Sequence, residues 1–287
     1  MISILSFAIV IAICVVVHEM EHFLTARAVG VHVHEFSFGF GPVLVSRIRK
    51  GTKWSLRAAP LGGFVRLAGL EEEGEETVPA GGAFMEKSAW KRFLILFNGP
   101  LANMLLAVFL TALFLAGHGT LDMQSTRIGE IMPGFPAEKG GMLVGDEIRN
   151  INGIAVTSWR EMSETIRNQA VSGPVTFGFV RSGETRTITV GIPRDAESGV
   201  PVFGIRPSMK RYAPHEAFVS AFGYTVSMSV EMIRNIVGWI TRKIDVDVTG
   251  PVGIATMAGD AARRGWWTFV SFLALISLNL GLLNLFP

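Results

Sequence analysis

Long uncharged runs divide the chain. The first covers residues 2–17, the second residues 93–117 and the last residues 266–287, and none of them contains Asp, Glu, Lys or Arg. A weaker run at residues 217–240 is interrupted by one Glu and one Arg. Because a helix needs about 20 residues to cross the hydrocarbon layer of a bilayer, we expect four membrane-spanning helices.

The first of these spans is expected to be retained rather than cleaved as a signal peptide. No Lys or Arg precedes Arg27, and no small-x-small cleavage site precedes the charged residues that follow Val17. The first helix is therefore extended through these charged residues, over residues 1–30.

Basic side chains predict the orientation of the spans. The segments between the first and second spans and between the third and fourth are rich in Lys and Arg, and the positive-inside rule places both in the cytoplasm. The N-terminus and residues 118–216 then lie outside. We expect a multi-pass protein of the cell inner (cytoplasmic) membrane.

Two segments between the spans have the pattern of β-structure. Residues 31–69 alternate apolar and polar positions, with turn signals at "KGTK" and "PLGG", and predict short strands. The run "EEEGEE" at residues 71–76 is interpreted as a solvated loop without a function. Residues 118–207 contain a short helix and several strands, with turns at Asn152-Gly153 and Ser182-Gly183.

The second β-rich segment resembles a PDZ domain. The resemblance lies in Pro136-Ala137, Gly145–Ile148, Ile151–Gly153 and Val180–Gly183. It implies that an extended peptide binds by addition to a sheet edge, and the alternative is a packing domain that binds nothing. The expected order is a first helix (1–30), a cytoplasmic-side β region with the acidic loop (31–92), a second helix (93–117), the PDZ-like α+β domain (118–208), a third helix with a cytoplasmic loop (209–265) and a fourth helix (266–287).

Composition agrees with an α-helical membrane protein that carries a soluble part. Of the 287 residues, 49% are hydrophobic and 17% are charged, against roughly a quarter charged in a typical soluble protein. The mean hydropathy is +0.41. The net charge of +2 is too small to indicate a nucleic-acid partner, and the single cysteine, Cys14, permits no disulfide within the chain.

The chemistry concentrates in "HEMEH" at residues 18–22, directly after the first apolar run. On a helix, His18 and His22 lie one turn apart on the same face and can share one metal ion. Glu19 is placed to act on a water at that metal, which is the His-Glu-x-x-His arrangement of zinc proteases. Ionisable groups within a span are costly unless they are paired, hydrated or bound to a metal. The alternative is that the motif is simply solvated at the cytoplasmic interface.

The other histidines are not expected to bind metal. His32 and His34 alternate on a predicted strand, while His118 and His215 flank the external domain. None of them has metal-ligand spacing to His18 and His22.

The motifs together resemble the site-2 protease family of intramembrane zinc metalloproteases, in particular the bacterial branch similar to the regulator of sigma-E protease. The resemblance rests on "HEMEH", "FSFGFGP", "PLGGFVRLAG", "FNGPLANMLLA", "TGPVGIA" and "NLGLLNLFP" together with the PDZ-like insert. It implies that His18 and His22 bind Zn²⁺ and that Glu19 is the catalytic acid/base. The strands of residues 33–68 would form a membrane-associated β-hairpin region that holds the substrate extended.

The resemblance extends to the later spans. Gly99, Pro100 and Asn103 match the family's second-span motif, with a structural role as open as a functional one. Asn284 matches the start of the last motif and is assigned to substrate binding.

Two positions depart from the family pattern. The aspartate of the last motif, which the family uses as its third zinc ligand, is absent because the sequence ends at Pro287. This suggests a truncated chain that binds zinc weakly. Glu21 stands within the motif where the family has a small residue; it could pair with Arg27 or another basic group, line the cavity, or offer an oxygen to the metal.

The predicted function is a zinc endopeptidase that cleaves membrane-spanning segments of other proteins. The resemblance suggests anti-sigma factors or remnant signal peptides as substrates. Its partners would be a single-span membrane protein, the lipid bilayer and a peptide at the PDZ groove, and no nucleic acid. The alternative is a catalytically inactive membrane adaptor whose PDZ domain recruits partners; a metal transporter is weaker, because one ligand cluster on one helix makes no path.

Overall fold

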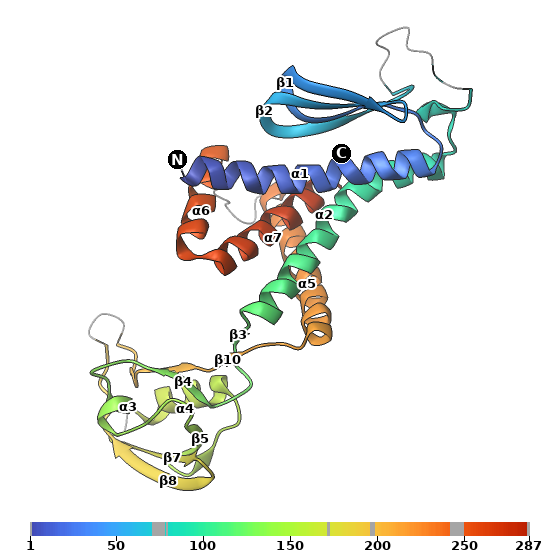
Figure 1. Cartoon of the computed structure of the whole chain (residues 1–287). Coiled ribbons are helices and arrows are strands. Elements are labelled where there is room, and N and C mark those ends of the chain that lie inside the picture. The colour runs from blue at the N-terminus through green and yellow to red at the C-terminus, as the bar shows by residue number, and fades with distance from the viewer. Residues whose placement is uncertain are drawn as a thin grey trace. The chain divides into compact units, whose positions relative to one another are not determined.

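The computed structural model of the chain describes residues 2–70, 78, 80–170, 173–195, 199–241 and 250–285. The acidic run at 71–76 and the final residues Phe286 and Pro287 lie outside the described residues. The chain divides into two compact units (Figure 1). One comprises Met1–Gly117 with Ala213–Pro287, and the other comprises His118–Tyr212.

Three helices of the first unit are long and apolar enough to cross a membrane. They are α1 (Ile2–Ala28), α2 (Ala89–Gly117) and α7 (Trp266–Leu283). α1 and α2 each contain one of the uncharged runs of the sequence, and α7 lies within the last run, so these three predicted spans form as helices, and the chain is a membrane protein.

The fourth predicted span forms a helix of a different character. α5 (Pro214–Ile240) carries Glu216, Glu231 and Arg234, and it is not among the three candidate spans of the described residues. Its place in the bilayer therefore stays a prediction. The predicted cytoplasmic loop that follows contains a further helix, α6 (Pro251–Arg264), which packs so closely on α1 that Gly259 contacts Ser3.

The predicted β-hairpin is formed by β1 (Val33–Arg49) and β2 (Thr52–Leu67). The chain reverses at Lys50 and Gly51, whose φ angles are 51° and 80°. Two successive positive φ angles are typical of the tight type I′ turn. A short 3₁₀ helix, η1 (Phe84–Glu86), leads from the hairpin region to α2.

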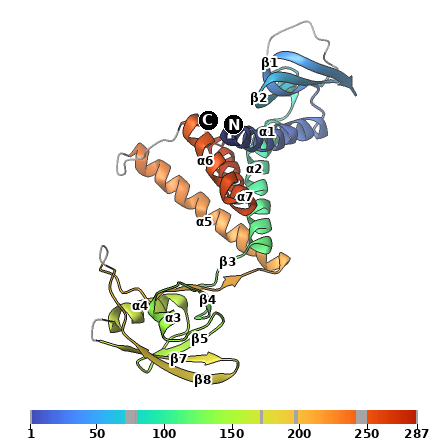
Figure 2. The same ribbon diagram turned by 60° about the vertical axis from the view of Figure 1, so that its left-hand side comes forward.

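Both strands of the hairpin bend back on themselves. Phe36 pairs with Val65 and also with Trp54, so one stretch of β1 has β2 on both sides. Four segments consequently lie side by side, in the order 43–49, 52–57, 35–38 and 63–67. This sheet lies along the C-terminal part of α1 in both views (Figures 1 and 2).

Inside the sheet, one carboxylate gathers several donors. Glu35 is 4% exposed. It accepts hydrogen bonds from Ser55 and from Arg57, the latter at 2.8 Å, and Lys53 lies 3.9 Å away. Burial raises the pKa of Glu35, but the Ser55 and Arg57 hydrogen bonds outweigh it and hold the pKa below its ordinary value.

Small residues bring α2 and α7 together. A Cβ on Gly281 would lie 3.0 Å from the Pro100 carbonyl oxygen and 2.9 Å from Met104 Cγ. Ser277 is fully buried, and its hydroxyl donates to the Asn103 carbonyl at 2.8 Å. Close backbone approach and interhelical hydrogen bonds replace the hydrophobic effect as the packing force between helices in lipid.

The second unit is a small α+β domain. Its main sheet has the order β6-β5-β7-β8, all antiparallel, and two short pairs, β4 with β9 and β3 with β10, complete it. The elements are β3 (Thr120–Leu121), β4 (Ile128–Ile131), α3 (Pro136–Lys139), β5 (Glu147–Ile151), β6 (Ile154–Ala155), α4 (Trp159–Gln169), β7 (Val175–Arg181), β8 (Glu184–Val190), β9 (Ile205–Pro207) and β10 (Met209–Lys210).

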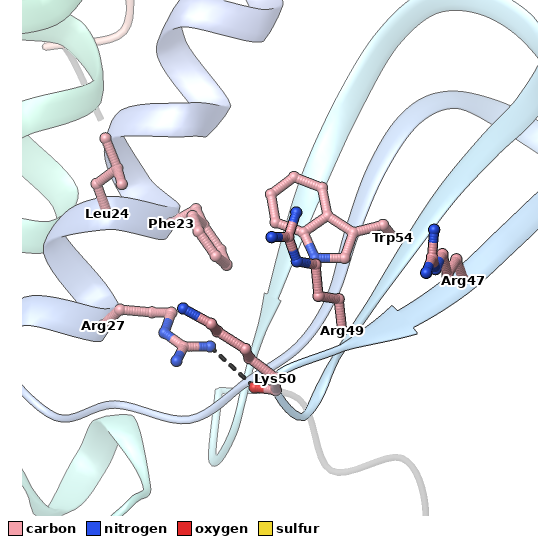
Figure 3. Close-up of a pocket in the computed structure, with 7 residues that line it drawn as sticks. All are labelled: Phe23, Leu24, Arg27, Arg47, Arg49, Lys50 and Trp54. Atoms are coloured by element: carbon pink, nitrogen blue, oxygen red, sulfur yellow. Dashed lines mark hydrogen bonds between the residues drawn. The ribbon is translucent and has the colours of Figure 1, made fainter.

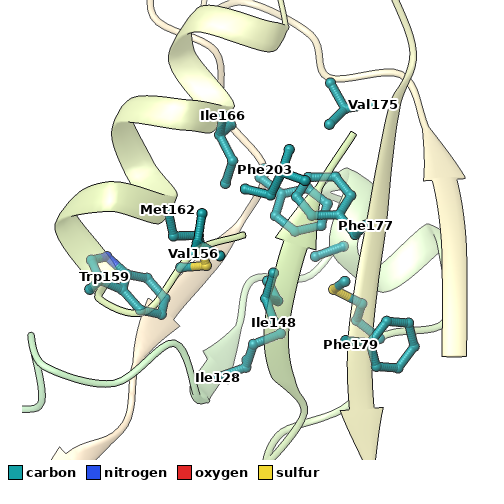
Figure 4. Packing of buried hydrophobic residues seen from close by; sticks show 13 residues of the cluster. Ile128, Ile148, Val156, Trp159, Met162, Ile166, Val175, Phe177, Phe179 and Phe203 are labelled. Atoms are coloured by element: carbon teal, nitrogen blue, oxygen red, sulfur yellow. The ribbon is translucent and has the colours of Figure 1, made fainter. Parts of the chain in front are cut away.

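The core of this unit lies between α4 and the sheet (Figure 4). Phe177 and Phe203 stack at 4.2 Å between ring centroids, and Met162 of α4 is fully buried beside them. Asp146, 1% exposed, forms two 2.7 Å hydrogen bonds with the guanidinium of Arg181 and tethers β7 to the turn before β5.

Candidate metal centre

The predicted motif residues lie together on α1. The Nε2 atoms of His18 and His22 are 3.1 Å apart, and the two rings meet edge to face at 4.6 Å between centroids. The i, i+4 spacing puts both imidazoles on one helix face. Both nitrogens therefore point to the same place, as a shared metal ion requires.

A carbonyl of the neighbouring helix orients one of these rings. His22 Nδ1 lies 2.6 Å from the carbonyl oxygen of Ile95 in α2. A carbonyl oxygen only accepts, so Nδ1 carries the hydrogen and Nε2 carries the free lone pair. Histidine ligands of metals typically donate their second nitrogen to a carbonyl or carboxylate in this way.

The turn of α2 beside the histidines carries a glycine at the point of closest approach. Gly99 lies so close that a Cβ there would collide with Cε1 and Nε2 of the His22 ring and would lie 3.0 Å from His18 Cε1. Pro100, at the next position, lacks the N–H that would continue the helix ladder to Leu96. Gly99 thus makes room for the pair of imidazoles, which gives this position of the second-span motif a physical reason.

Glu19 faces the sheet rather than α2. A Cβ on Gly63 of β2 would be 3.5 Å from Glu19 Cγ and 3.3 Å from Val15 Cγ1. The backbone of Val65 also interacts with the Glu19 carboxylate. The segment 63–67 pairs with β1 on one side only, so an edge that pairs with no second β-strand of the described residues runs past this glutamate.

The two imidazoles fit zinc. Two ligands about 2.0–2.1 Å from one zinc ion at a tetrahedral angle stand about 3.3–3.4 Å apart, close to the 3.1 Å between the Nε2 atoms of His18 and His22. Neutral imidazole is a preferred zinc donor. Within the described residues, no group of three or more His, Cys, Asp or Glu side chains gathers at one place, so the donor set seen is this pair.

The other predicted residues are not joined to the pair by a hydrogen bond or a metal group of the described residues. Asn284 caps the end of α7 and is exposed, and no hydrogen bond of the described residues joins it to His18, Glu19 or His22. His32 and His34 contact one another at 5.0 Å between ring centroids on the sheet. Neither they nor the remaining histidines, His118 and His215, complete a metal group in the described part of the chain.

Glu21 has a partner on its own helix. Thr25 Oγ1 donates to Glu21 at 3.1 Å, and Asn98 of α2 donates in turn to Thr25 at 3.0 Å. Arg27, considered as a partner for Glu21, instead donates to the Lys50 carbonyl at 3.1 Å. In the structure Glu21 is therefore bonded to the hydroxyl of Thr25, and Arg27 is bonded to the hairpin turn.

Sequence reasoning missed the residues that support the site through their backbone. The carbonyl of Ile95 and the bare backbone of Gly63 contact His22 and Glu19, respectively. Every residue has a backbone carbonyl, so the sequence does not indicate which carbonyl contacts a histidine. The only available signals were Gly99, as part of the second-span motif, and the paired glycines of "PLGG".

Comparisons with known proteins identify a family that matches nearly the whole chain. The family described as Peptidase family M50 matches residues 6–287. A Fusobacterium nucleatum protein is 29% identical over 97% of this chain and 82% of its own length, and a Clostridium acetobutylicum protein is 31% identical over 100% and 81%. Both carry the name "Putative zinc metalloprotease". Among solved structures, the PDZ domain of an SdrC-like protein from Listeria monocytogenes covers 30% of this chain and 90% of that chain, with 20% identity and a TM-score of 0.26.

Proposed function

Since the chain belongs to peptidase family M50, we propose that this zinc metalloprotease cleaves peptide bonds within the membrane-spanning segments of other proteins. The observation that carries the proposal is the position of His18, Glu19 and His22 on α1, a helix apolar enough to span a membrane. Ionisable groups on such a helix are expensive unless they serve a site.

His18 and His22 would hold the zinc ion through Nε2. The Ile95 carbonyl keeps the hydrogen of His22 on Nδ1, 2.6 Å away, and leaves Nε2 free for the metal. Zinc, when bound, lowers the pKa of a water molecule and polarises the scissile carbonyl. A catalytic zinc ion has three protein ligands; the family resemblance implies that the third would be an aspartate of the last motif, which is not among the residues of this sequence.

Glu19 would move the proton. Its carboxylate accepts a proton from the attacking water and delivers it to the nitrogen of the leaving amine, the usual task of a general acid/base. Val15 and the backbone of Gly63 lie beside its side chain, and the backbone of Val65 interacts with its carboxylate, so the proposed general base lies next to the segment 63–67 of β2.

The substrate would bind as a strand. A helical segment hides its carbonyl groups in its own hydrogen bonds, so it must be extended before it can be cleaved. The edge at 63–67 of β2, which pairs with no second β-strand among the described residues, runs beside Glu19. Addition of a strand to this edge gives main-chain hydrogen bonds and brings scissile carbonyls next to the glutamate.

The second unit is proposed to act as a PDZ domain on the extracytoplasmic side of the inner membrane. Its antiparallel sheet and α4 fit peptide capture at a sheet edge. Such a domain would restrict access to substrates whose outer part has already been removed. Anti-sigma factors and remnant signal peptides are the proposed substrate classes, and Asn284 is proposed to contact the substrate at the end of α7.

A cleavage assay tests the protease mechanism. The complete reading frame and its E19Q variant are reconstituted with a model single-span substrate. We expect E19Q to lower cleavage by about 100-fold or more, because general acid/base catalysis contributes about 10²–10⁴-fold. Zinc content of H18A and H22A, measured by mass spectrometry, tests the ligands; zinc retained at the wild-type level in both would refute their assignment. Equal cleavage by E19Q and wild type would instead favour an adaptor.

A further inference from the structure

A cavity of about 510 Å³ lies where the end of α1 meets the hairpin, and neither His18 nor His22 lines it. Four of its lining residues are cations, Arg27, Arg47, Arg49 and Lys50, and the others are Phe23, Leu24 and Trp54. Figure 3 shows Phe23 and Arg27 of α1 facing Arg49, Lys50 and Trp54 of the hairpin, with Arg47 on the far side of Trp54. Among the described residues, no Asp or Glu lines the cavity.

The cations of this cavity have no counter-charge in the described part of the chain. None of the ion pairs there involves any of the four. Arg27 is held by the Lys50 carbonyl at 3.1 Å, and its guanidinium lies 5.8 Å from the centre of the Phe23 ring. The bond from Arg27 fixes the turn of the hairpin to the end of α1, so the positive charges are gathered before any ligand binds.

The rest of the cavity is apolar and belongs to the end of a membrane span. Leu24 is 51% exposed, four residues before α1 ends at Ala28. The same outer segment of β1 that carries Arg47 and Arg49 also exposes Val45 and Ile48, at 65% and 76%. Apolar surface next to cations without a counter-charge, at the end of a span, matches the boundary between acyl chains and head groups.

We propose that this cavity binds an anionic phospholipid, with the phosphate among Arg47, Arg49 and Lys50 and the upper acyl chain against Leu24 and Trp54. The charge complementarity selects a phosphate, which Arg can bind through two hydrogen bonds. The apolar wall selects a lipid over a soluble anion. By holding the hairpin at the membrane surface, the lipid would keep the edge of β2 at the depth of Glu19.

The experiment uses the full chain in nanodiscs of phosphatidylcholine with about 30% phosphatidylglycerol. After gentle release, native mass spectrometry counts the phosphatidylglycerol molecules retained. Each basic side chain near an anionic surface contributes about a fivefold change in affinity, so R47Q/R49Q is expected to lower retention by about tenfold or more. R47K/R49K, which keeps the charge, is expected to retain most of it.

The matched control removes the same charge elsewhere. K91Q/R92Q alters two basic residues at the start of α2, outside the cavity, and should retain phosphatidylglycerol as the wild type does. Phosphatidylglycerol with brominated acyl chains should quench the part of the tryptophan fluorescence that is lost in W54F. In a separate measurement, millimolar inorganic phosphate should not displace the lipid.

Several results would overturn the proposal. One is equal loss of lipid in R47Q/R49Q and K91Q/R92Q, which indicates general surface charge. Others are unchanged retention in R47Q/R49Q and displacement of the lipid by inorganic phosphate alone. The last is a result in which a soluble Asp/Glu-rich peptide binds and its binding depends on Arg47 and Arg49, while retention of the lipid does not depend on them. That result would mean that the cavity binds a protein segment.

Discussion

Gly99 of α2 lies directly against the His22 ring of α1, at a distance that leaves no room for a methyl group. We expect G99A to displace the ring from the Ile95 carbonyl and from His18. Overpacking lowers the free energy of unfolding by about 1–3 kcal/mol. The larger effect is on the metal site: the zinc content should fall, and the rate of cleavage should drop by about 100-fold. Zinc analysis and the transmembrane-substrate assay measure both.

The control for G99A is another helical glycine. A methyl group on Gly223 of α5 would have no described atom within 4 Å outside its own stretch of helix, so G223A should leave zinc and cleavage unchanged and stabilise the helix by up to about 1 kcal/mol. If G99A behaves like G223A, Gly99 does not make room for the metal ligands.

Glu21 is predicted to be dispensable although it lies between the two histidines in sequence. Its carboxylate is bonded to Thr25, which is bonded to Asn98. E21Q keeps the shape and the acceptor oxygen, so cleavage should stay within about threefold of wild type, whereas E19Q removes the general base. A marked loss of zinc from E21Q would show that Glu21 is a ligand after all.

Local patterns account for what could be predicted. The separation of His18 and His22 by four residues places them on one face of a helix. Long uncharged runs predict the membrane-spanning helices α1, α2 and α7. Neither inference needs knowledge of distant contacts. The placement of His18, Glu19 and His22 could therefore be read from one short motif on one apolar helix.

Contacts between distant segments account for what was missed. The alternating pattern of residues 31–69 suits a straight hairpin as well as a bent one, and the pairing of Phe36 with both Trp54 and Val65 depends on the fold-back. α6 has helix signals of its own, with Pro251 at its first turn and Gly265 after its end. The basic residues of this segment lead to its interpretation as a cytoplasmic loop, which does not use these helix signals.

The buried carboxylate of the hairpin gives a prediction that links the sheet to activity. E35Q removes the charge that Arg57 and Ser55 bind and leaves the guanidinium of Arg57 without its partner. Loss of one member of an ion pair lowers the free energy of unfolding by about 3–5 kcal/mol when both members are fully buried. Because Arg57 is 21% exposed, a loss of about 1–3 kcal/mol is expected for E35Q. Amide hydrogen exchange in β1 and β2 should accelerate, and cleavage should fall as the edge beside Glu19 loosens.

The matched variant for E35Q is K53Q. Lys53 lies 3.9 Å from Glu35 and is 39% exposed, so removal of its charge should change the amide hydrogen exchange of β1 and β2 little. Unchanged exchange in E35Q would show that the sheet does not depend on this carboxylate.

The pair of Asp146 and Arg181 predicts a pH dependence in the second unit. Burial raises the pKa of Asp146, but the hydrogen bonds from Arg181 and from the Leu143 backbone outweigh it and hold the pKa below its ordinary value. An acid whose pKa is lowered by folding stabilises the fold above its unfolded pKa, about 3.9 for Asp, and this contribution is lost as the pH falls through the folded pKa. D146N should therefore destabilise the unit by about 1–3 kcal/mol at pH 7 and pH 5, and the difference from wild type should shrink below about pH 4.

Exchange-monitored unfolding of β5 and β7 in the full chain at pH 7, 5 and 3 measures this difference. E184Q is the control, because Glu184 and Arg186 form a 2.9 Å pair whose side chains are 72% and 49% exposed; exposed pairs contribute about 0–1 kcal/mol. A D146N effect that is the same at pH 3 as at pH 7 would mean that the ionised carboxylate is not what Arg181 stabilises, and an effect no larger than that of E184Q would mean that burial adds nothing to the pair.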